Sequence, residues 1–229
     1  MWPKSLNSYR SIHELRDDAR NMRSSKPQNK LRSTVRIAVV DDEKFLPFAN
    51  LHSYGYNITE LPDLKSISDI EAYDIVLCDL MGVGVHFDKS IGGASIISEI
   101  KKNYPTKFVV AYSGARANST EAVAARDFAD EFIKKDADIS KWVERLDEMI
   151  NTVVDPYEMW LVARQGLIDN EIDIRRIVEL EDAYVTSIRN RDSSFSLVRS
   201  ILTKVDIGAN AKGIVQGLIS SAIFALVVG

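Results

Sequence analysis

Short apolar segments that alternate with helix-like segments constrain the fold of this 229-residue chain more than any other feature. Runs rich in β-branched and aromatic residues predict five strands, at 35–40, 56–61, 74–79, 107–113 and 130–135. Apolar residues at helical spacing predict a helix after each strand, at 43–55, 64–73, 93–103, 119–129 and 139–150. The strands show little polar alternation, which is typical of strands buried on both faces. The pattern predicts a doubly wound α/β fold with a five-stranded parallel sheet.

The charge of the chain is unevenly distributed. The net charge is −4, yet residues 1–36 carry nine Lys/Arg and only three Asp/Glu. We expect residues 1–34 to form a basic helical arm, with one amphipathic helix over 5–30 that ends near 24–30. Its apolar side would consist of Ile12, Leu15, Ala19 and Met22. A solvated helix is the favoured interpretation, and contact with the acidic body, a partner or a membrane is the alternative.

The cysteine content and the N-terminus point to a reducing, cytoplasmic location. Cys78 is the single cysteine, so no disulfide can form within the chain. It lies inside an apolar run, where inert packing is the expected role. The N-terminus lacks the apolar core of a signal peptide. The three histidines are scattered without the spacing of a zinc site.

The carboxyl ends of the predicted strands carry the candidate functional residues. Parallel strands end at one edge of their sheet, so these side chains should converge there. They are Asp41, Asp42 and Glu43 after the first strand, Asp79 after the third, Ser113 after the fourth, and Lys134 and Lys135 after the fifth. Clustered carboxylates repel one another unless a cation lies between them, and oxygen ligands suit Mg²⁺.

Aspartyl-phosphate chemistry fits this set of side chains. We predict that Asp41 and Asp42 hold the metal and that Asp79 accepts a phosphoryl group. The Ser113 hydroxyl and the Lys135 ammonium group would contact the phosphoryl or carboxylate oxygens. Taken singly, each residue has a structural alternative: the first two acids could cap a helix, and the serine and lysine could be turn and surface residues. Their joint occurrence favours the phosphoacceptor site.

The motifs "VVDDE", "LCDLM", "AYSGA" and "FIKKD", in this order over residues 35–153, resemble the receiver domain of bacterial two-component response regulators. The resemblance implies a CheY-like fold and phosphorylation of Asp79 by a histidine kinase or a phosphotransfer protein. It also implies Mg²⁺ bound at Asp41, Asp42, Asp79 and Met81. Such a domain catalyses its own phosphorylation and slow dephosphorylation and is not a metabolic enzyme. Phe132, three residues before the lysine, matches an aromatic rotamer switch, although a core position is the alternative.

Three features depart from that family's pattern. No proline follows Met81, and the loop 82–93 is longer than usual. The glycines of this loop fit neither GxGxxG nor a P-loop, so we expect a flexible loop rather than a phosphate cradle. Asp136, not proline, follows the lysine, so we expect a trans peptide bond there.

Residues 154–229 form a predicted helical output or oligomerisation region, with helices at 157–168, 171–191 and 194–205. An apolar stripe runs along the second helix and consists of Ile174, Ile177, Leu180, Tyr184 and Ile188. The stripe could be a dimer seam or a face packed on the receiver-like domain. We expect residues 156–229 to form a homodimer or to bind a partner protein. It lacks a basic cluster and a helix-turn-helix pattern, which argues against nucleic acid as a partner.

Small residues recur at every fourth position of the C-terminal tail 208–229. They are Ala209, Gly213, Gly217, Ser221, Ala225 and Gly229. This spacing is the small-residue pattern of packed membrane helices, which leaves membrane association open. However, residues 213–229 include Gln216 and two serines and are shorter than the usual span of about 20 apolar residues. The pattern therefore favours a soluble, closely packed helix.

Two other functions remain open. A receiver-like fold could serve as a phosphorylation-independent interaction module that presents the tail to a partner or a membrane. The acidic cluster could also belong to a Mg²⁺-dependent phosphohydrolase, although the chain lacks a DxDxT arrangement.

Overall fold

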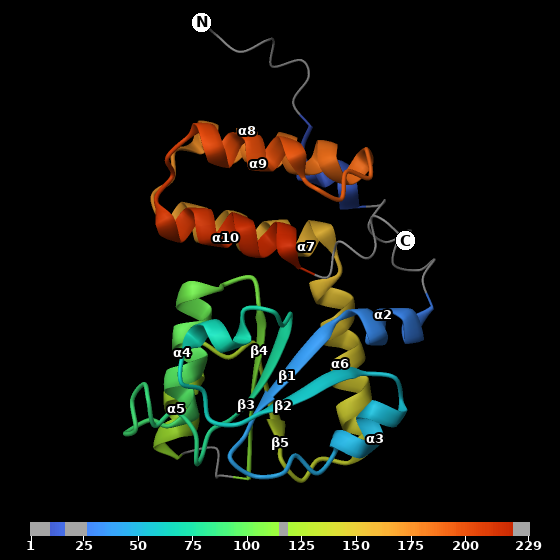
Figure 1. Ribbon diagram of the computed structural model, residues 1–229, viewed down its shortest axis with the longest axis vertical. Coiled ribbons are helices and arrows are strands. Elements are labelled where there is room, and N and C mark those ends of the chain that lie inside the picture. The colour runs from blue at the N-terminus through green and yellow to red at the C-terminus, as the bar shows by residue number, and fades with distance from the viewer. Residues whose placement is uncertain (1–9, 17–26, 115–118, 222–229) are drawn as a thin grey trace, which may run out of the picture.

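A five-stranded parallel sheet forms the centre of the chain in a computed structural model that describes residues 10–16, 27–114 and 119–221 (Figure 1). The strands are β1 Arg36–Val40, β2 Asn57–Leu61, β3 Ile75–Asp79, β4 Phe108–Ser113 and β5 Glu131–Lys134. All neighbouring strands pair in parallel, in the order β2-β1-β3-β4-β5. The predicted doubly wound α/β fold with five parallel strands is confirmed.

Both faces of the sheet are buried, and the strand sequences reflect this. In β1, Ile37 and Val39 belong to one hydrophobic core, whereas Ala38 and Val40 belong to the other. Helices α2, α3 and α6 cover the first face, and α4 and α5 cover the second (Figure 1). Their bounds are α2 Gln28–Thr34, α3 Phe48–Ser53, α4 Gly93–Asn103, α5 Thr120–Ala125 and α6 Ile139–Val153.

Three of the predicted helices are shorter in the structure. The helix expected at 43–55 begins only at Phe48, because Pro47 cannot occupy a helix interior. The segment 64–73 forms no α-helix but a 3₁₀ helix, Ile67–Ile70. There the Asp69 carboxylate accepts hydrogen bonds from local main-chain N–H groups, which competes with helix formation. The helix expected at 119–129 ends at Ala125.

The predicted N-terminal helix 5–30 is wrong in its extent. Ile12–Glu14 form a 3₁₀ helix, and the remaining part of the segment that would carry Ala19 and Met22 lies outside the described residues. Helix α2 begins at Gln28, where the predicted helix should end. Pro27 explains the difference, because its fixed φ of −60° and its missing N–H suit a helix start.

Among the described residues, four helices follow α6 and confirm the predicted helical C-terminal region. They are α7 Pro156–Asp169, α8 Ile174–Arg189, α9 Ser196–Lys204 and α10 Ala209–Ser220. Four of the five residues of the apolar stripe of α8 pack within this region, against α7 and α9, whereas Ile174 is exposed. Tyr184 stacks between Trp160 and Phe195, with ring centroids 5.2 and 5.7 Å away, and Ile12 packs on the same helix.

The helical region lies beyond the edge at which the strands begin, opposite the edge at which they end (Figure 1). Only Val154 and Asp155 separate α6 from α7, and the Asp155 side chain caps α7. One hydrophobic core runs from the sheet face under α6 through Val153 and Met159 into the helical region. The two parts are therefore packed against each other rather than joined by a linker.

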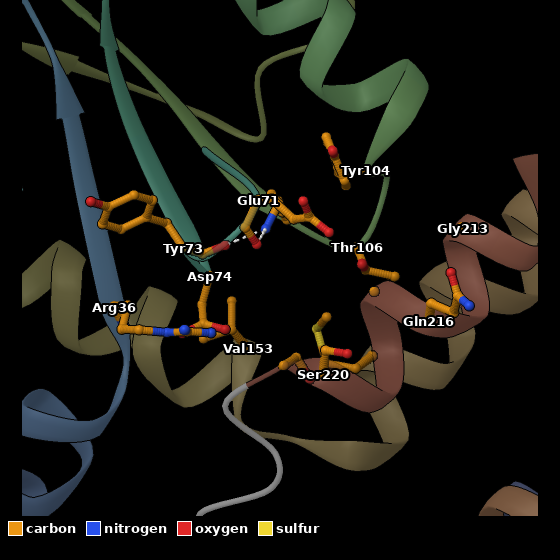
Figure 2. A pocket seen from close by; sticks show the side chains of 14 residues that line it. Arg36, Glu71, Tyr73, Asp74, Tyr104, Thr106, Val153, Gly213, Gln216 and Ser220 are labelled. Carbon is orange, nitrogen blue, oxygen red and sulfur yellow. Dashed lines mark hydrogen bonds and ion pairs between the residues drawn. The ribbon is translucent and has the colours of Figure 1, made fainter. Parts of the chain in front are cut away.

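Helix α10 approaches the starting edge of the sheet closely. A Cβ atom on Gly217 would lie 3.1 Å from Thr106 Oγ1. A cavity of about 120 Å³ lies beside this contact and is lined by Arg36, Asp74 and Gln216 among others (Figure 2). Close packing is thus shown at Gly217 but not at Gly213, where a Cβ atom would have nothing within 4 Å, and Ala225 and Gly229 lie outside the described residues. Among the helices that the structure describes, none is long and apolar enough to cross a membrane.

Candidate functional site

Three carboxylates meet at the edge of the sheet where the strands end. Oxygen atoms of Asp41, Asp42 and Asp79 all lie within 4.8 Å of one another. Asp41 directly follows β1 and Asp79 is the last residue of β3, and these two strands are neighbours in the sheet. Asp41 and Asp79 are buried, while Asp42 is exposed. The parallel topology therefore assembles the acids that the sequence predicted, with one of them open to solvent.

Lys135 supplies a positive charge to this cluster. It directly follows β5, and its Nζ atom lies 2.7 Å from Asp79 Oδ2 and 3.2 Å from Asp41 Oδ2. Burial of the ammonium group opposes its charge, but the hydrogen bonds to Asp79 and Asp41 outweigh this and raise the pKa of Lys135 to about 12. The lysine stays protonated at neutral pH and offsets part of the carboxylate charge.

Main-chain groups fix the orientation of the two buried carboxylates. The N–H of Glu43 donates to Asp41 Oδ1 over 2.9 Å, and the N–H of Met81 donates to Asp79 Oδ1 over 3.3 Å. Each carboxylate thus has one oxygen held by the backbone and one facing Lys135. Such paired hydrogen bonding makes the burial of a carboxylate tolerable.

Tyr112 is a member of the site that the sequence reasoning missed. Its hydroxyl donates to Asp41 Oδ2 over 2.6 Å, and its ring is wholly buried. Burial raises the pKa of Tyr112 well above its ordinary value, and the hydrogen bond to Asp41 adds to this, so the phenol remains a donor. A tyrosine one residue before Ser113, within a mostly apolar strand, was the available signal, because a buried phenol needs an acceptor.

Glycines give the carboxylates their space. Gly82 has φ +76°, and a Cβ atom there would lie 2.1 Å from Asp42 Oδ1. At Gly93, a Cβ atom would lie 1.8 Å from the carbonyl oxygen of Asp79. The loop between them, expected to be flexible, is tied down by the Asp63 carboxylate, which accepts from the N–H groups of Gly84 and Val85 over 2.6 and 3.1 Å. Gly82 and Gly93 therefore let the chain pass close to Asp42 and to the main chain of Asp79.

The donor set fits a hard divalent cation. Mg²⁺ prefers oxygen ligands and retains several waters, which suits three carboxylates of which one is exposed. The Met81 side chain is half-exposed, and its thioether is a poor ligand for Mg²⁺, so this residue could contribute only its main-chain carbonyl oxygen. Asp41, Asp42, Asp79 and that carbonyl are the groups that could hold the ion.

The strand order 2-1-3-4-5, all parallel, is that of the CheY-like doubly wound sheets. In such sheets the site lies outside the carboxyl ends of the strands, where the acid cluster is found here. Residues 36–153 have the receiver fold. The chain thus consists of a domain with this fold, called the receiver domain below, and a helical C-terminal region.

Comparisons with solved structures also find receivers. NtrX from Brucella abortus is 27% identical over 58% of this chain and 30% of its own, with a TM-score of 0.45. The isolated receiver domain of the same protein is 27% identical over 51% of this chain and 98% of its own, with a TM-score of 0.43. A CheY-like receiver protein from Methanospirillum hungatei is 16% identical over 52% of this chain and 95% of its own, with a TM-score of 0.42.

This chain spans less than a third of the NtrX structure. No protein-family model matches the sequence, and no curated protein matches it. The strand order and the acid cluster, rather than these overlaps, carry the assignment of the fold.

The other residues singled out in the sequence are Ser113, Phe132 and Cys78, and each lies on a strand of the sheet. Ser113 ends β4, the strand beside β3, and its carbonyl accepts from the N–H of Lys135 over 3.2 Å. Phe132 pairs across the sheet with Ala111 and is 44% exposed, so it is not a core residue. The peptide bond after Lys135 is trans, as expected. Cys78 is wholly buried, and burial raises the pKa of its thiol.

Proposed function

We propose that this chain is a signalling protein whose receiver domain is phosphorylated on Asp79. The donor would be a phosphohistidine of a histidine kinase or of a phosphotransfer protein. One observation carries the proposal: the buried Asp79 carboxylate lies 2.7 Å from Lys135 Nζ and within 4.8 Å of two further carboxylates, at the edge where receivers carry their site. A cytoplasmic location accords with a chain whose single cysteine is a buried thiol.

The proposed step is the transfer of a phosphoryl group from nitrogen to oxygen. An oxygen of Asp79 forms a bond to phosphorus while the bond between phosphorus and the donor imidazole breaks. The imidazole leaves with the electron pair of that bond and takes up a proton from solvent. Mg²⁺, when bound, neutralises charge on the phosphoryl oxygens. The Lys135 ammonium group and the Ser113 hydroxyl would contact those oxygens. The product of the transfer is an aspartyl phosphate at Asp79.

Phosphorylation with acetyl phosphate and Mg²⁺ tests this proposal, with intact mass or Phos-tag mobility as the readout. We expect wild-type protein to gain one phosphoryl group and Asp79→Asn to gain none. Asp74→Asn is the matched control, because Asp74 is a buried acid that directly precedes the same strand and pairs with Arg36. This control should be phosphorylated like the wild type. A phosphoryl adduct that persists in Asp79→Asn contradicts the proposal. So does a wild type that stays unmodified under conditions in which a known receiver, used as a positive control, is phosphorylated.

The output is proposed to pass through α6. This helix begins four residues after Lys135, covers one face of the sheet and continues, after two residues, into α7 of the helical region. The helical region also exposes Val162, Ile168 and Ile174, which could contact a second copy or a partner protein. Size-exclusion chromatography with light scattering, before and after phosphorylation, should show a change in mass if this region dimerises on activation.

A second candidate function is a receiver-like module that acts without phosphorylation. The sheet and the helical region share one hydrophobic core, which favours this second function. Without a linker between them, the helical region is not free to move away from the sheet when Asp79 is modified. Hydrogen exchange of α7 to α10 distinguishes the two candidates once Asp79 has been modified. Changed protection supports the switch, and unchanged protection on a fully modified protein supports the fixed module.

A further inference from the structure

The buried hydroxyl of Tyr112 contacts the acid cluster directly. It lies 2.6 Å from Asp41 Oδ2, closer than the 3.2 Å between the same oxygen and Lys135 Nζ. Tyr184, another wholly buried tyrosine, donates instead to the main-chain carbonyl of Pro156. The acceptor of Tyr112 is therefore one of the carboxylates that could hold the metal, rather than a structural carbonyl.

The ring of Tyr112 is held in place by aromatic packing. Phe45 and Trp142 meet it edge to face, with ring centroids 5.4 and 5.9 Å from that of Tyr112, and they also pack on each other at 5.1 Å. All three rings are buried. Edge-to-face packing of this kind restricts the ring, so the direction of the hydroxyl is fixed before any ligand arrives.

We propose that Tyr112 is a positioning residue for the Mg²⁺ site, acting through Asp41. This inference rests on the proposed function, because that function needs the metal. The N–H of Glu43 fixes Oδ1 of Asp41 over 2.9 Å, and the Tyr112 hydroxyl fixes Oδ2. With both oxygens restrained, the Asp41 carboxylate is oriented toward Asp42 and Asp79 before the ion binds. Hydrogen-bond partners of metal ligands commonly contribute to metal affinity in this way.

Removal of the hydroxyl should weaken Mg²⁺ binding while leaving the fold intact. We expect Tyr112→Phe, which keeps the ring, to raise the dissociation constant for Mg²⁺ about tenfold. The measurement is the rise in melting temperature with Mg²⁺ concentration, which reports affinity without any turnover. Circular dichroism of each variant confirms that it is folded before the titration.

Tyr56→Phe is the matched control. The Tyr56 hydroxyl also donates to a carboxylate, Asp147 Oδ1, over 2.7 Å, but Tyr56 lies just before β2, at the opposite edge of the sheet. This variant should lose some stability and bind Mg²⁺ as the wild type does. Equal loss of Mg²⁺ affinity in both variants would mean that a general loosening, not the Asp41 contact, is responsible, and would overturn the inference.

A double-mutant cycle with Asp41→Asn tests whether Tyr112 acts through this carboxylate. We expect Tyr112→Phe to have no further effect on Mg²⁺ affinity once Asp41 is changed. Wild-type Mg²⁺ affinity in Tyr112→Phe, with Asp79 still phosphorylated, overturns the inference and leaves the proposed function standing. A wild type whose melting temperature does not respond to Mg²⁺ overturns both.

Discussion

At the scale of single residues, the site depends on glycine as well as on the acids, because glycine has no side chain to occupy the space that an acid needs. The carboxylate of Asp42 fills the space that a side chain on Gly82 would occupy, with a hypothetical Cβ 2.1 Å from its Oδ1 atom. The turn at Gly82 and the Asp42 carboxylate therefore occupy complementary volumes.

Gly82→Ala should disturb both the backbone and the acid site. Its positive φ alone should cost about 1–2 kcal/mol of unfolding free energy, and the displaced Asp42 should weaken Mg²⁺ binding. Gly55→Ala is the control, because Gly55 has φ +87° and nothing within 4 Å of its hypothetical Cβ. It should lose similar stability and keep its Mg²⁺ affinity. Equal Mg²⁺ affinity in both variants would show that the contact with Asp42 does not matter for the site.

The acids and the lysine could be predicted from the sequence because topology alone brings strand ends together. Asp41, Asp79 and Lys135 needed only the inference of a parallel sheet. Tyr112 could not be placed in the same way, since its partner depends on the direction of a ring within a three-ring cluster. The space beside Gly82 was equally hidden, because it depends on the approach of the Asp42 side chain from the loop after β1.

At the scale of elements, the strands were easier to predict than the helices. The central strands β1, β3 and β4 are mostly apolar runs, so their positions follow from composition. The helices around the sheet depend on local competition, as where Pro47 delays α3 and Asp69 favours a 3₁₀ helix. The loop 82–93 shows the same limit, because its order comes from a carboxylate nineteen or more residues away in sequence, Asp63.

Asp63→Ala should loosen the loop 82–93. It removes the acceptor of the N–H groups of Gly84 and Val85, and we expect a loss of about 2 kcal/mol of unfolding free energy. Faster hydrogen exchange at these two amides should accompany it. Asp88→Ala is the comparison within the loop, since Asp88 is exposed and accepts only local bonds from Ser90. A larger effect at Asp88 than at Asp63 would contradict this account.

Lys107, in the turn between α4 and β4, should make stability depend on pH. Burial lowers the pKa of its ammonium group to about 8, although the nearby Asp74 raises it. Its Nζ atom donates to the carbonyl oxygens of Glu71 and Tyr73, and all three residues line the cavity beside α10. Figure 2 labels Glu71 and Tyr73 in this wall of the cavity. The pKa of an unfolded lysine is about 10.4, so between pH 8 and 10 the unfolded chain binds more protons than the folded one.

Stability should therefore rise over this range by on the order of 1 kcal/mol from Lys107 alone. Urea denaturation at pH 8, 9 and 10 measures the change, and Lys107→Met provides the reference chain. The difference in unfolding free energy between wild type and Lys107→Met should shift in favour of the wild type as the pH rises. A constant difference would mean that this lysine has an ordinary pKa.

At the scale of the whole molecule, one hydrophobic core joins the receiver domain to the helical region. It includes Val153 and Val154 at the junction, Met159 and Trp160 of α7, and Ile12 from the other end of the chain. The described helices α7 to α10 lie beyond the starting edge of the sheet, opposite the edge at which the strands end (Figure 1). If Asp79 accepts a phosphoryl group as proposed, these helices would not have to move for a donor protein to approach it.

The shared core predicts that both parts unfold together. In urea, hydrogen exchange measured by mass spectrometry should give the same midpoint for peptides from α4 and from α8. Two separate parts would show two midpoints, because each would carry its own core. Replacement of Met159 by Ala should lower the free energy of unfolding by about 2–5 kcal/mol. Both urea midpoints should therefore decrease together. Separate midpoints in the wild type would contradict a common core.

The contact of the N-terminal segment with α8 has a consequence for synthesis on the ribosome. The N–H of Ile12 donates to Glu181 Oε1 over 2.9 Å, across 169 positions of sequence. At about 5–20 residues per second, roughly ten seconds or more pass between the emergence of the two partners. Throughout that interval Ile12 and Leu15 lack their native neighbours, while the receiver sheet can already assemble. The first apolar residues of the described chain are thus among the last to be buried, and a chaperone could bind them during that wait.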